Sequence, residues 1–401
     1  MKIFVTNHSV FPYADFRYGG TEKRVYFLAK YLRRNGVDAE IVSSIPRNGS
    51  RKEIYEGIPY NFIGPHFTPS TAYPGLDSRG IIPMVNLARF SANLSLFLRK
   101  QTFDVLHAHL TDPYFYLRLD SRRPTVFQPW EEIHIPVRDI LNEKPPSGVR
   151  AFAFRSLKGH VDQFCMEHAE AVASESEAQT RVFIERFKIE REKVFHLPVG
   201  VDMEYILNRT TSVNLTREDL GLREKDFVLI SANRLDRAKG LNFLIDAMYL
   251  LKNEIRDVKL VLIGTGPEEE ALKSQANERG LDSNIKFVGN IPESKYYQVL
   301  SLSDVYVSPG FQYISTTTIL DAMACGLAVV STIPSFNVKD KVNGYVVPKK
   351  SARAIADAII KIYDSGESEQ FGRRSFEMAR RYDYKILVNN AIHKYEELIK
   401  K

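Results

Sequence analysis

Cysteine is scarce in this sequence. Only Cys165 and Cys325 occur among 401 residues, and neither lies at a spacing from histidines or a second cysteine that would hold zinc. Two cysteines cannot build a disulfide framework, which excludes a small disulfide-stapled secreted domain. A reducing compartment, the cytoplasm, is expected.

Long hydrophobic runs are also missing. The longest apolar stretch, residues 81–98, is interrupted by Pro83 and by Asn86, Arg89 and Asn93, which form one polar helical stripe. The pattern is typical of a well-buried helix, with a helix on a membrane surface as the alternative, and it does not span a bilayer. The first residues read as a strand and lack the apolar core of a signal peptide.

A strong charge of one sign is absent as well. The chain has 55 basic and 49 acidic residues, of which 27 basic and 22 acidic ones fall in residues 1–200. The basic excess of the first half is either a solvated surface or a contact for an anionic acceptor or anionic lipid headgroups at the inner face of the membrane. No aromatic-basic recognition motif accompanies it, so we expect no nucleic-acid partner.

What the sequence does contain is an ordinary globular composition, with 44% hydrophobic and 26% charged residues, in a length that fits two domains. Short apolar runs alternate with helical patterns. The predicted strands are residues 2–6, 39–43, 105–108, 125–128, 171–174, 194–197, 227–231, 259–263, 285–288, 305–308, 328–331 and 344–347. Near-continuous apolar strands between helices are typical of parallel sheets covered on both faces, so we expect an α/β fold.

The alternation restarts near residue 202, and a polar stretch precedes the next strand. We therefore predict a Rossmann-like domain at 1–205, a second at 206–383, and a final helix at 384–401. Sheets of this kind bind ligands at the carboxyl ends of their strands, and a central cleft between the domains is expected to hold the substrate.

Gly19 and Gly20 lie between the first strand and the first helix. Glycines let backbone amides approach a ligand, and a helix start offers free N–H groups, so phosphate is the favoured guest. A double glycine can also be no more than a tight turn.

Arg234 and Lys239 follow the first strand of the second domain. A guanidinium fork and a mobile ammonium at the carboxyl end of a strand would make a clamp for a diphosphate. From spacing alone, two surface cations in a loop is an equal interpretation.

Gly264 and Gly266 come after another strand of this domain and imitate a dinucleotide fingerprint. The third glycine is missing and the strand is not the first of its domain, which argues against NAD binding. A glycine-assisted turn into a helix beginning near Pro267 explains the pattern better.

Thr316 and Thr317 are predicted to open a helix that Gly326 ends. This is a second anion-ready helix start, and Asp321 follows about a turn and a half later. A carboxylate there could accept hydrogen bonds from a ribose diol, or it could be a solvated helix charge.

Taken together and in this order, these segments resemble the family-4 retaining glycosyltransferases (group 1) of the two-Rossmann GT-B fold. The resemblance covers essentially the whole chain. Its carriers are residues 19–20, 104–109, 196–202, 234–240, 286–289, 320–326 and 342–347.

The resemblance implies an enzyme that uses a nucleotide-diphosphate sugar such as a UDP or GDP sugar. Arg234 and Lys239 would neutralise the diphosphate, and Gly19 and Gly20 would approach it from the first domain. Thr316 and Thr317 would offer backbone amides to the phosphates, and Asp321 would hold the ribose. Val288 would lie beside the base, and the helix at 384–401 would cross back onto the first domain.

The chain also departs from the family pattern. Tyr313 stands where the family usually has a glutamate that reaches the donor sugar, and Asp321 replaces a second glutamate. After the strand at 125–128, where the family often has a histidine, the chain has Trp130 and Glu131. These two residues and His109 are candidates for the acceptor or sugar pocket, although a histidine at a strand end is more often structural.

The predicted reaction is retaining transfer of a sugar to a hydroxyl of a glycan or a lipid-linked acceptor. The family is thought to let the leaving phosphate accept the proton, so no dedicated base is required. We expect no cofactor and no metal, because the sequence has no DxD-like motif for the cleft. The alternative is a catalytically degenerate sugar-nucleotide-binding protein on the same fold, which the departures leave open.

Overall fold

The computed structural model describes residues 1–8, 20–44, 52–64, 81–110, 112–129, 149–211, 215–311, 316–333 and 338–401. The chain divides into two compact units, the first made of residues 1–198 and 384–401 and the second of residues 199–383. The sequence-based boundary after residue 205 falls inside helix α8 (Met203–Thr211), which belongs to the second unit.

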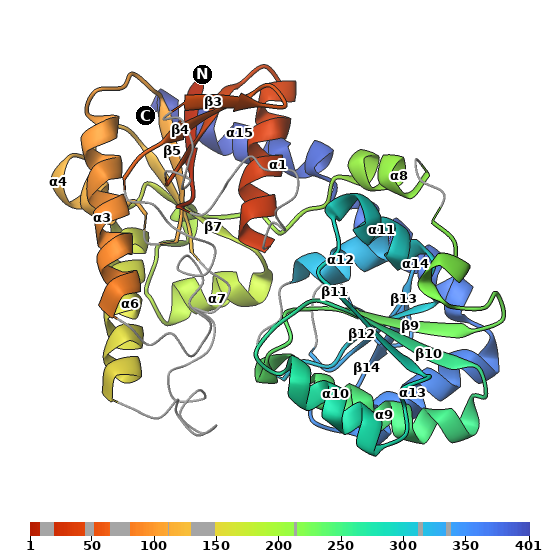
Figure 1. Cartoon of the computed structure of the whole chain (residues 1–401). Helices are drawn as coiled ribbons and strands as arrows, with labels where there is room; N and C mark the ends of the chain where they lie inside the picture. Colours follow the sequence, from red (N-terminus) through yellow and green to blue (C-terminus); the bar gives the residue numbers. More distant parts are fainter. Residues whose placement is uncertain are drawn as a thin grey trace. The chain divides into compact units, whose positions relative to one another are not determined.

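The first unit is built on an eight-stranded sheet in the order β3-β4-β2-β1-β5-β6-β7-β8 (Figure 1). Every pair is parallel except β3 with β4. The strands are β1 (Lys2–Thr6), β2 (Asp38–Ser43), β3 (Lys52–Tyr55), β4 (Ile58–Phe62), β5 (Val105–His109), β6 (Thr125–Gln128), β7 (Ala171–Ser174) and β8 (Val194–His196). The helices are α1 (Gly20–Arg34), α3 (Ile81–Leu98), α4 (Tyr114–Leu119), α6 (Val149–His168), α7 (Glu177–Glu185) and α15 (Tyr384–Lys400).

The second unit has a six-stranded parallel sheet in the order β11-β10-β9-β12-β13-β14. The strands are β9 (Phe227–Ala232), β10 (Val258–Ile263), β11 (Ile285–Gly289), β12 (Val305–Ser308), β13 (Ala328–Ser331) and β14 (Gly344–Val346). Besides α8, the helices are α9 (Leu241–Glu254), α10 (Glu269–Glu278), α11 (Glu293–Ser301), α12 (Thr316–Ala324), α13 (Ala352–Ser365) and α14 (Ser368–Arg380).

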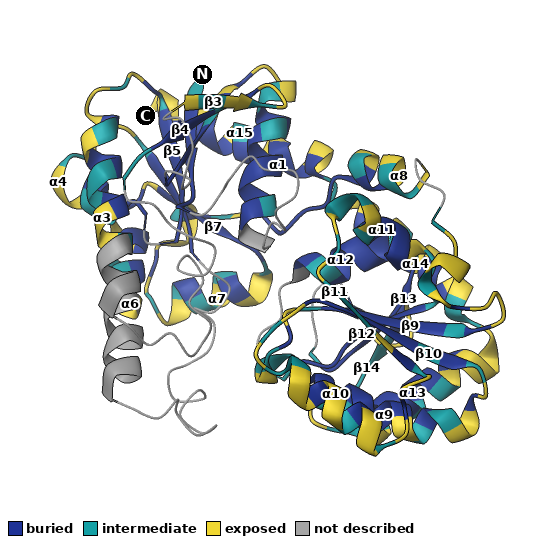
Figure 2. Ribbon diagram, viewed as in Figure 1, coloured by how far each residue is buried: buried dark blue, intermediate teal, exposed yellow. Residues whose placement is uncertain are grey.

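Helices cover both faces of the second sheet, as the near-continuous apolar strands predict. Side chains of α9, α10 and α13 form one buried cluster with the sheet, and those of α8, α11, α12 and α14 form another on the opposite face. Figure 2 shows the strands between them as mostly buried. Burying apolar surface on both faces is the main force that holds such a layer together.

The last helix of the chain returns to the first unit. Tyr384 of α15 stacks on Phe27 and Tyr31 of α1, with ring centroids 5.6 and 6.1 Å away. The Tyr395 hydroxyl lies 2.5 Å from Nδ1 of His107 on β5. The expected return of the C-terminal helix to the first domain is therefore confirmed.

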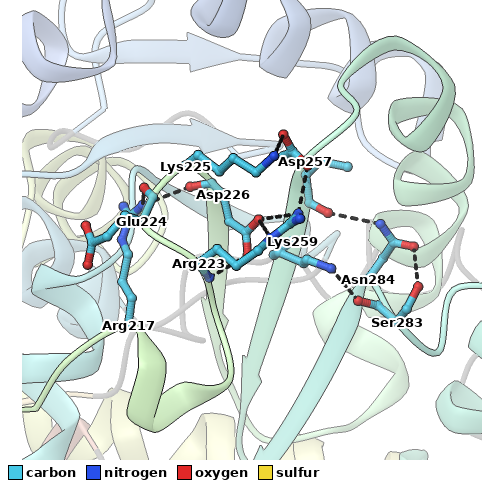
Figure 3. Close-up of polar contacts among 10 residues, drawn as sticks. Arg217, Arg223, Glu224, Lys225, Asp226, Asp257, Lys259, Ser283 and Asn284 are labelled. Carbon is cyan, nitrogen blue, oxygen red and sulfur yellow. Dashed lines mark hydrogen bonds and ion pairs between the residues drawn. The ribbon is translucent and has the colours of Figure 1, made fainter.

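An ionic cluster closes the amino-terminal edge of the second sheet (Figure 3). Arg223 contacts Asp226, just before β9, at 2.8 Å and Asp257, just before β10, at 2.7 Å. Arg217 donates hydrogen bonds to the backbone of the same turn and to Asp304 before β12. These contacts fix the starts of the strands, at the edge opposite to their carboxyl ends.

Candidate functional site

Each parallel sheet has a point where the strand order changes direction. In the second unit β9, the first strand, pairs with β10 on one side and with β12 on the other. Segments leaving neighbouring strands in opposite directions leave room for a ligand at the carboxyl ends. The loop after β9 and helix α12 after β12 both lie at this edge, and they carry five of the predicted site residues: Arg234, Lys239, Thr316, Thr317 and Asp321.

The loop after β9 is held rigidly. The Leu235 amide donates to the carbonyl of Thr265 at 3.0 Å, and the Glu268 amide donates to the carbonyl of Leu235 at 3.0 Å. A Cβ atom on Gly264 would come within 1.8 Å of the Asn233 carbonyl oxygen, and one on Gly266 within 2.3 Å of that of Leu235. The two glycines are therefore required where the turn that leads to α10 approaches the loop after β9.

Arg234 and Lys239 lie at the two ends of this loop. Asp236 caps a short 3₁₀ helix, Arg237–Lys239, by accepting a hydrogen bond from the Ala238 amide at 3.0 Å. The Arg234 side chain is exposed and that of Lys239 is half-buried. Within the part of the chain that the structure describes, neither cation has a hydrogen bond or an ion pair. No described side chain therefore competes with an anion for these two charges.

Helix α12 is tied to the same loop. The Phe311 amide, at the start of the connection from β12, donates to the Ala238 carbonyl at 3.2 Å. The buried Tyr306 hydroxyl bonds to the Ala232 carbonyl at 3.3 Å and to Oγ1 of Thr318 at 2.9 Å. The first turn of α12, which carries Thr318, is therefore held close to the end of β9, the strand that leads into the loop of the two cations.

The donor-site residues on α12 are partly described. Thr316 is the first residue of the helix, Thr317 is buried, and Gly326 ends the helix with a φ of 79°. Asp321 is only 3% exposed, so it is not a solvated helix charge. The Tyr297 hydroxyl of α11 donates to its Oδ1 atom at 3.4 Å.

The remaining donor-site predictions fall in different places. Val288 is half-buried near the end of β11, two strands away from β9. Gly20 is the first residue of α1 in the first unit. Gly19 and Tyr313 lie outside the described residues.

The first unit has its own change of strand direction at β1, which pairs with β2 and β5. Beyond β1 and β5 lies a buried polar cluster. His8 contacts Oδ1 of Asp112 through Nδ1 at 3.0 Å, and Oγ1 of Thr6 donates to Oδ2 of Asp112 at 3.2 Å. Burial raises the pKa of Asp112, although the neighbouring His8 opposes the shift. This cluster joins the ends of the two strands.

His109 ends β5 and is fully buried. Its Nδ1–H donates to the carbonyl of Thr6 at 3.1 Å. Burial, reinforced by His107 and Arg24, lowers the pKa of His109 well below its ordinary value, so the ring is neutral. Nε2 is a buried acceptor without a hydrogen-bond partner in the described chain. The other pocket candidates, Trp130 and Glu131, lie outside the described residues.

Sequence reasoning missed one group of side chains next to Asp321. Tyr205 of α8 and Glu293 and Tyr297 of α11 meet there through tertiary packing, with the Tyr205 hydroxyl donating to Oε2 of Glu293 at 2.9 Å. No motif marks these residues, because their meeting depends on the contact of α8 with α11 and not on local spacing.

Within the described ranges, no group of three or more histidine, cysteine, aspartate or glutamate side chains could hold a metal ion. The helices described there also include none long and apolar enough to cross a bilayer.

Family models match both halves of the chain. The model for Glycosyltransferase Family 4 matches residues 18–205, and the model for Glycosyl transferases group 1 matches residues 212–378. The chain belongs to the family-4, group 1 glycosyltransferases. It is therefore a sugar-transfer enzyme, as the ordered set of motifs implies.

Relatives of this glycosyltransferase include mannosyltransferases. It is 31% identical over 163 residues to a phosphatidyl-myo-inositol mannosyltransferase of Mycobacterium leprae, an alignment that covers 39% of this chain and 43% of that protein. It is 24% identical over 388 residues to the O-antigen chain mannosyltransferase C of Escherichia coli, covering 95% and 94% of the two chains.

Solved structures with the same fold cover the whole glycosyltransferase. Sucrose-phosphate synthase from Thermosynechococcus elongatus matches with a TM-score of 0.81 at 19% identity, covering 100% of this chain and 99% of that one. Anabaena HepE, in complex with UDP and glucose, matches with a TM-score of 0.70 at 18% identity, covering 99% and 100%. These likenesses confirm the predicted fold of two parallel-sheet α/β domains.

Proposed function

We propose that this glycosyltransferase moves a sugar from a nucleotide-diphosphate donor to an acceptor hydroxyl with retention, and that Arg234 and Lys239 stabilise the leaving diphosphate. The observation that carries the proposal is a pair of cations after the carboxyl end of β9 that form no side-chain hydrogen bond or ion pair within the described part of the chain. The first turn of α12 is held close to the same strand end through Tyr306. HepE with UDP-glucose shows that a protein of this fold binds a nucleotide sugar, which supports the choice of donor.

The chemistry follows from where charge develops. Breaking the bond between the anomeric carbon and the phosphate oxygen leaves negative charge on the diphosphate. Cations held in place before the reaction stabilise that charge without reorganisation, and such preorganised groups are commonly the largest contribution to catalysis. Arg234 supplies a planar set of donors and Lys239 a mobile point charge, so together they take the role that a metal ion can play elsewhere.

The other donor contacts extend this arrangement. The backbone amides of Thr316 and Thr317 bind the phosphates, Asp321 accepts hydrogen bonds from the ribose, and Val288 lies beside the base. Gly19 and Gly20 give the first helix a phosphate-ready start. The acceptor hydroxyl attacks on the face from which the diphosphate leaves, and its proton passes to the departing phosphate oxygen.

The acceptor is a glycan or a lipid-linked sugar. Two of the relatives are a phosphatidyl-myo-inositol mannosyltransferase and an O-antigen chain mannosyltransferase, which supports such acceptors. His109, Trp130 and Glu131 are assigned to the acceptor or sugar pocket, because His109 offers a buried acceptor atom at a strand end. The basic excess of the first half provides for contact with an anionic acceptor or lipid.

The test is a pair of substitutions at the clamp. Arg234→Ala and Lys239→Ala should each lower turnover at least about a hundredfold, because each removes one charge from the leaving group. Release of UDP or GDP from a panel of nucleotide sugars measures turnover. Arg256→Ala is the control, since Arg256 is an exposed cation before β10, at the opposite edge of the sheet.

Wild-type rates in both clamp variants would remove this mechanism. The tyrosine at position 313 favours one alternative, a degenerate protein that binds a nucleotide sugar without transferring it. Binding of a nucleoside diphosphate without any hydrolysis or transfer would favour that alternative.

A further inference from the structure

Two tyrosines and two carboxylates interlock on the α12 side of the second sheet. The Tyr205 hydroxyl donates to Oε2 of Glu293 at 2.9 Å, and the Tyr297 hydroxyl donates to Oδ1 of Asp321 at 3.4 Å. The two tyrosine rings meet edge to face, with centroids 6.0 Å apart. Each carboxylate therefore accepts a hydrogen bond from one tyrosine hydroxyl, and the contact between the two rings helps to fix the positions of these hydroxyls.

The hydrogen bond between Tyr297 and Asp321 is buried, so neither group can exchange its partner for water. Tyr297 is 1% exposed and Asp321 is 3% exposed. Burial, followed by the charges of Asp321 and Glu293, raises the pKa of Tyr297 well above its ordinary value, so the phenol keeps its proton. A buried carboxylate needs hydrogen-bond donors to offset its lost hydration, and Tyr297 supplies one of them.

Asp321 lies where the proposed nucleotide would place its ribose. Asp321 lies on α12, and Phe311 ties the connection that leads into this helix to the loop after β9. Tyr297 lies on α11, which follows the strand that carries Val288. A carboxylate accepts hydrogen bonds only, and two vicinal hydroxyls can both donate to it. Binding of a diol there depends on the direction in which the carboxylate points.

We propose that Tyr297 is a positioning residue that orients Asp321 toward the vicinal hydroxyls of the donor's ribose. It thereby makes the site select ribonucleotides over 2′,3′-dideoxynucleotides. The inference rests on the proposed function, because it takes the ligand of this edge to be a nucleoside diphosphate. It adds that selection for the ribose depends on a residue which itself touches no ligand.

The experiment compares one nucleotide with and without its diol. UDP, GDP and ADP are titrated calorimetrically into the full chain, and the tightest binder is then compared with its 2′,3′-dideoxy form. In Tyr297→Phe the ribonucleotide should bind about fivefold more weakly, because a hydrogen bond to a charged group is lost, while the dideoxy form binds as in the wild type. Asp321→Asn should remove most of the same preference, and adding Tyr297→Phe to it should have little further effect.

Tyr306→Phe is the matched control. Tyr306 is also a fully buried tyrosine of this unit with a bonded hydroxyl, but its partners are Ala232 and Thr318 and neither is a carboxylate. It should lower the melting temperature without changing the ratio of the two affinities. A ratio in Tyr297→Phe equal to that of the wild type, or an equal loss for both nucleotides, would overturn the assignment.

The two proposals fail in different ways. If Arg234→Ala abolishes nucleotide binding while Tyr297→Phe keeps the wild-type ratio, only the role of Tyr297 is lost. If none of the three nucleoside diphosphates binds to the wild-type chain, the proposed donor falls and the role of Tyr297 falls with it.

Discussion

The surroundings of His107 determine its protonation state. The Tyr395 hydroxyl donates to Nδ1, and the opposite ring nitrogen, Nε2, donates to Oε1 of Gln128 at 3.1 Å. The Nε2 atom of Gln128 in turn donates a hydrogen bond to the carbonyl of Leu197 at 3.4 Å. These partners suit a neutral ring, and burial lowers the pKa of His107 to about 4.

This pKa makes the stability of the first unit depend on pH. The unfolded chain takes up a proton near pH 6.5 and the folded chain only near pH 4, so the stabilising effect is lost as the pH falls below the unfolded value. From pH 7 to pH 5 the loss should be about 2 kcal/mol. His107→Gln should remove this part of the pH dependence in urea unfolding followed at both pH values.

His393→Gln is the control for that experiment, because His393 is exposed on α15, the helix that also carries Tyr395. An unfolding free energy of His107→Gln that falls with pH as steeply as that of the wild type would contradict the prediction.

At the scale of the element, apolar runs were enough to place the strands. Each predicted strand is present, because a strand buried on both faces leaves a continuous run of apolar residues. The hairpin of β3 and β4 was not predicted. β3 alternates between exposed and half-buried residues, Ile54 is 77% exposed, and Pro59 interrupts β4. Only the turn at Glu56 and Gly57, both with positive φ, marks it.

In the candidate site, too, some residues could be predicted from local sequence patterns and others could not. Arg234 and Lys239 could be proposed as donor ligands from the sequence, because the loop that follows a predicted strand is a local pattern. The group of Tyr205, Glu293 and Tyr297 could not, because α8 and α11 must first pack against each other before these side chains meet.

Gly240 provides a test of the loop that carries the two cations. Its φ is 63°, and a Cβ atom would lie 2.3 Å from the Pro309 carbonyl oxygen. Gly240→Ala should destabilise the second unit by roughly 3 kcal/mol and weaken nucleoside diphosphate binding, because Lys239 must move. Gly366→Ala has a similar φ of 66° with nothing within 4 Å of the added atom, and should cost only about 1 kcal/mol with binding unchanged. Equal effects in denaturant unfolding and calorimetric titration would show that the close approach does not matter.

At the scale of the whole molecule, the first unit is assembled from both ends of the described chain, whereas the second is continuous. The last helix contributes a row of buried side chains to the first unit: Tyr384, Leu387, Val388, Ala391, Tyr395 and Leu398. Burial of each large apolar side chain contributes about 1.5–3 kcal/mol, so the row is comparable to the whole stability of a typical domain.

Deleting residues 384–401 should therefore unfold the first unit and leave the second folded. Scanning calorimetry should show a single transition for the second unit, and limited proteolysis should leave a resistant fragment that begins near Val199. Deleting only residues 399–401, which are all exposed, is the control and should leave both units intact. A truncated chain with the unfolding profile of the full one would contradict this division of stability.

The return of α15 to α1 also bears on biosynthesis. During synthesis, residues 199–383 leave the ribosome before α15, the helix that completes the first unit. Helix α1 is therefore made long before its partner α15. Until that helix has left the exit tunnel, Phe27 and Tyr31 have no Tyr384 to stack against. Until then the apolar side chains of α1 that pack against α15 stay exposed, while residues 199–383 can already fold. We therefore expect chaperones to bind the first half of the nascent chain.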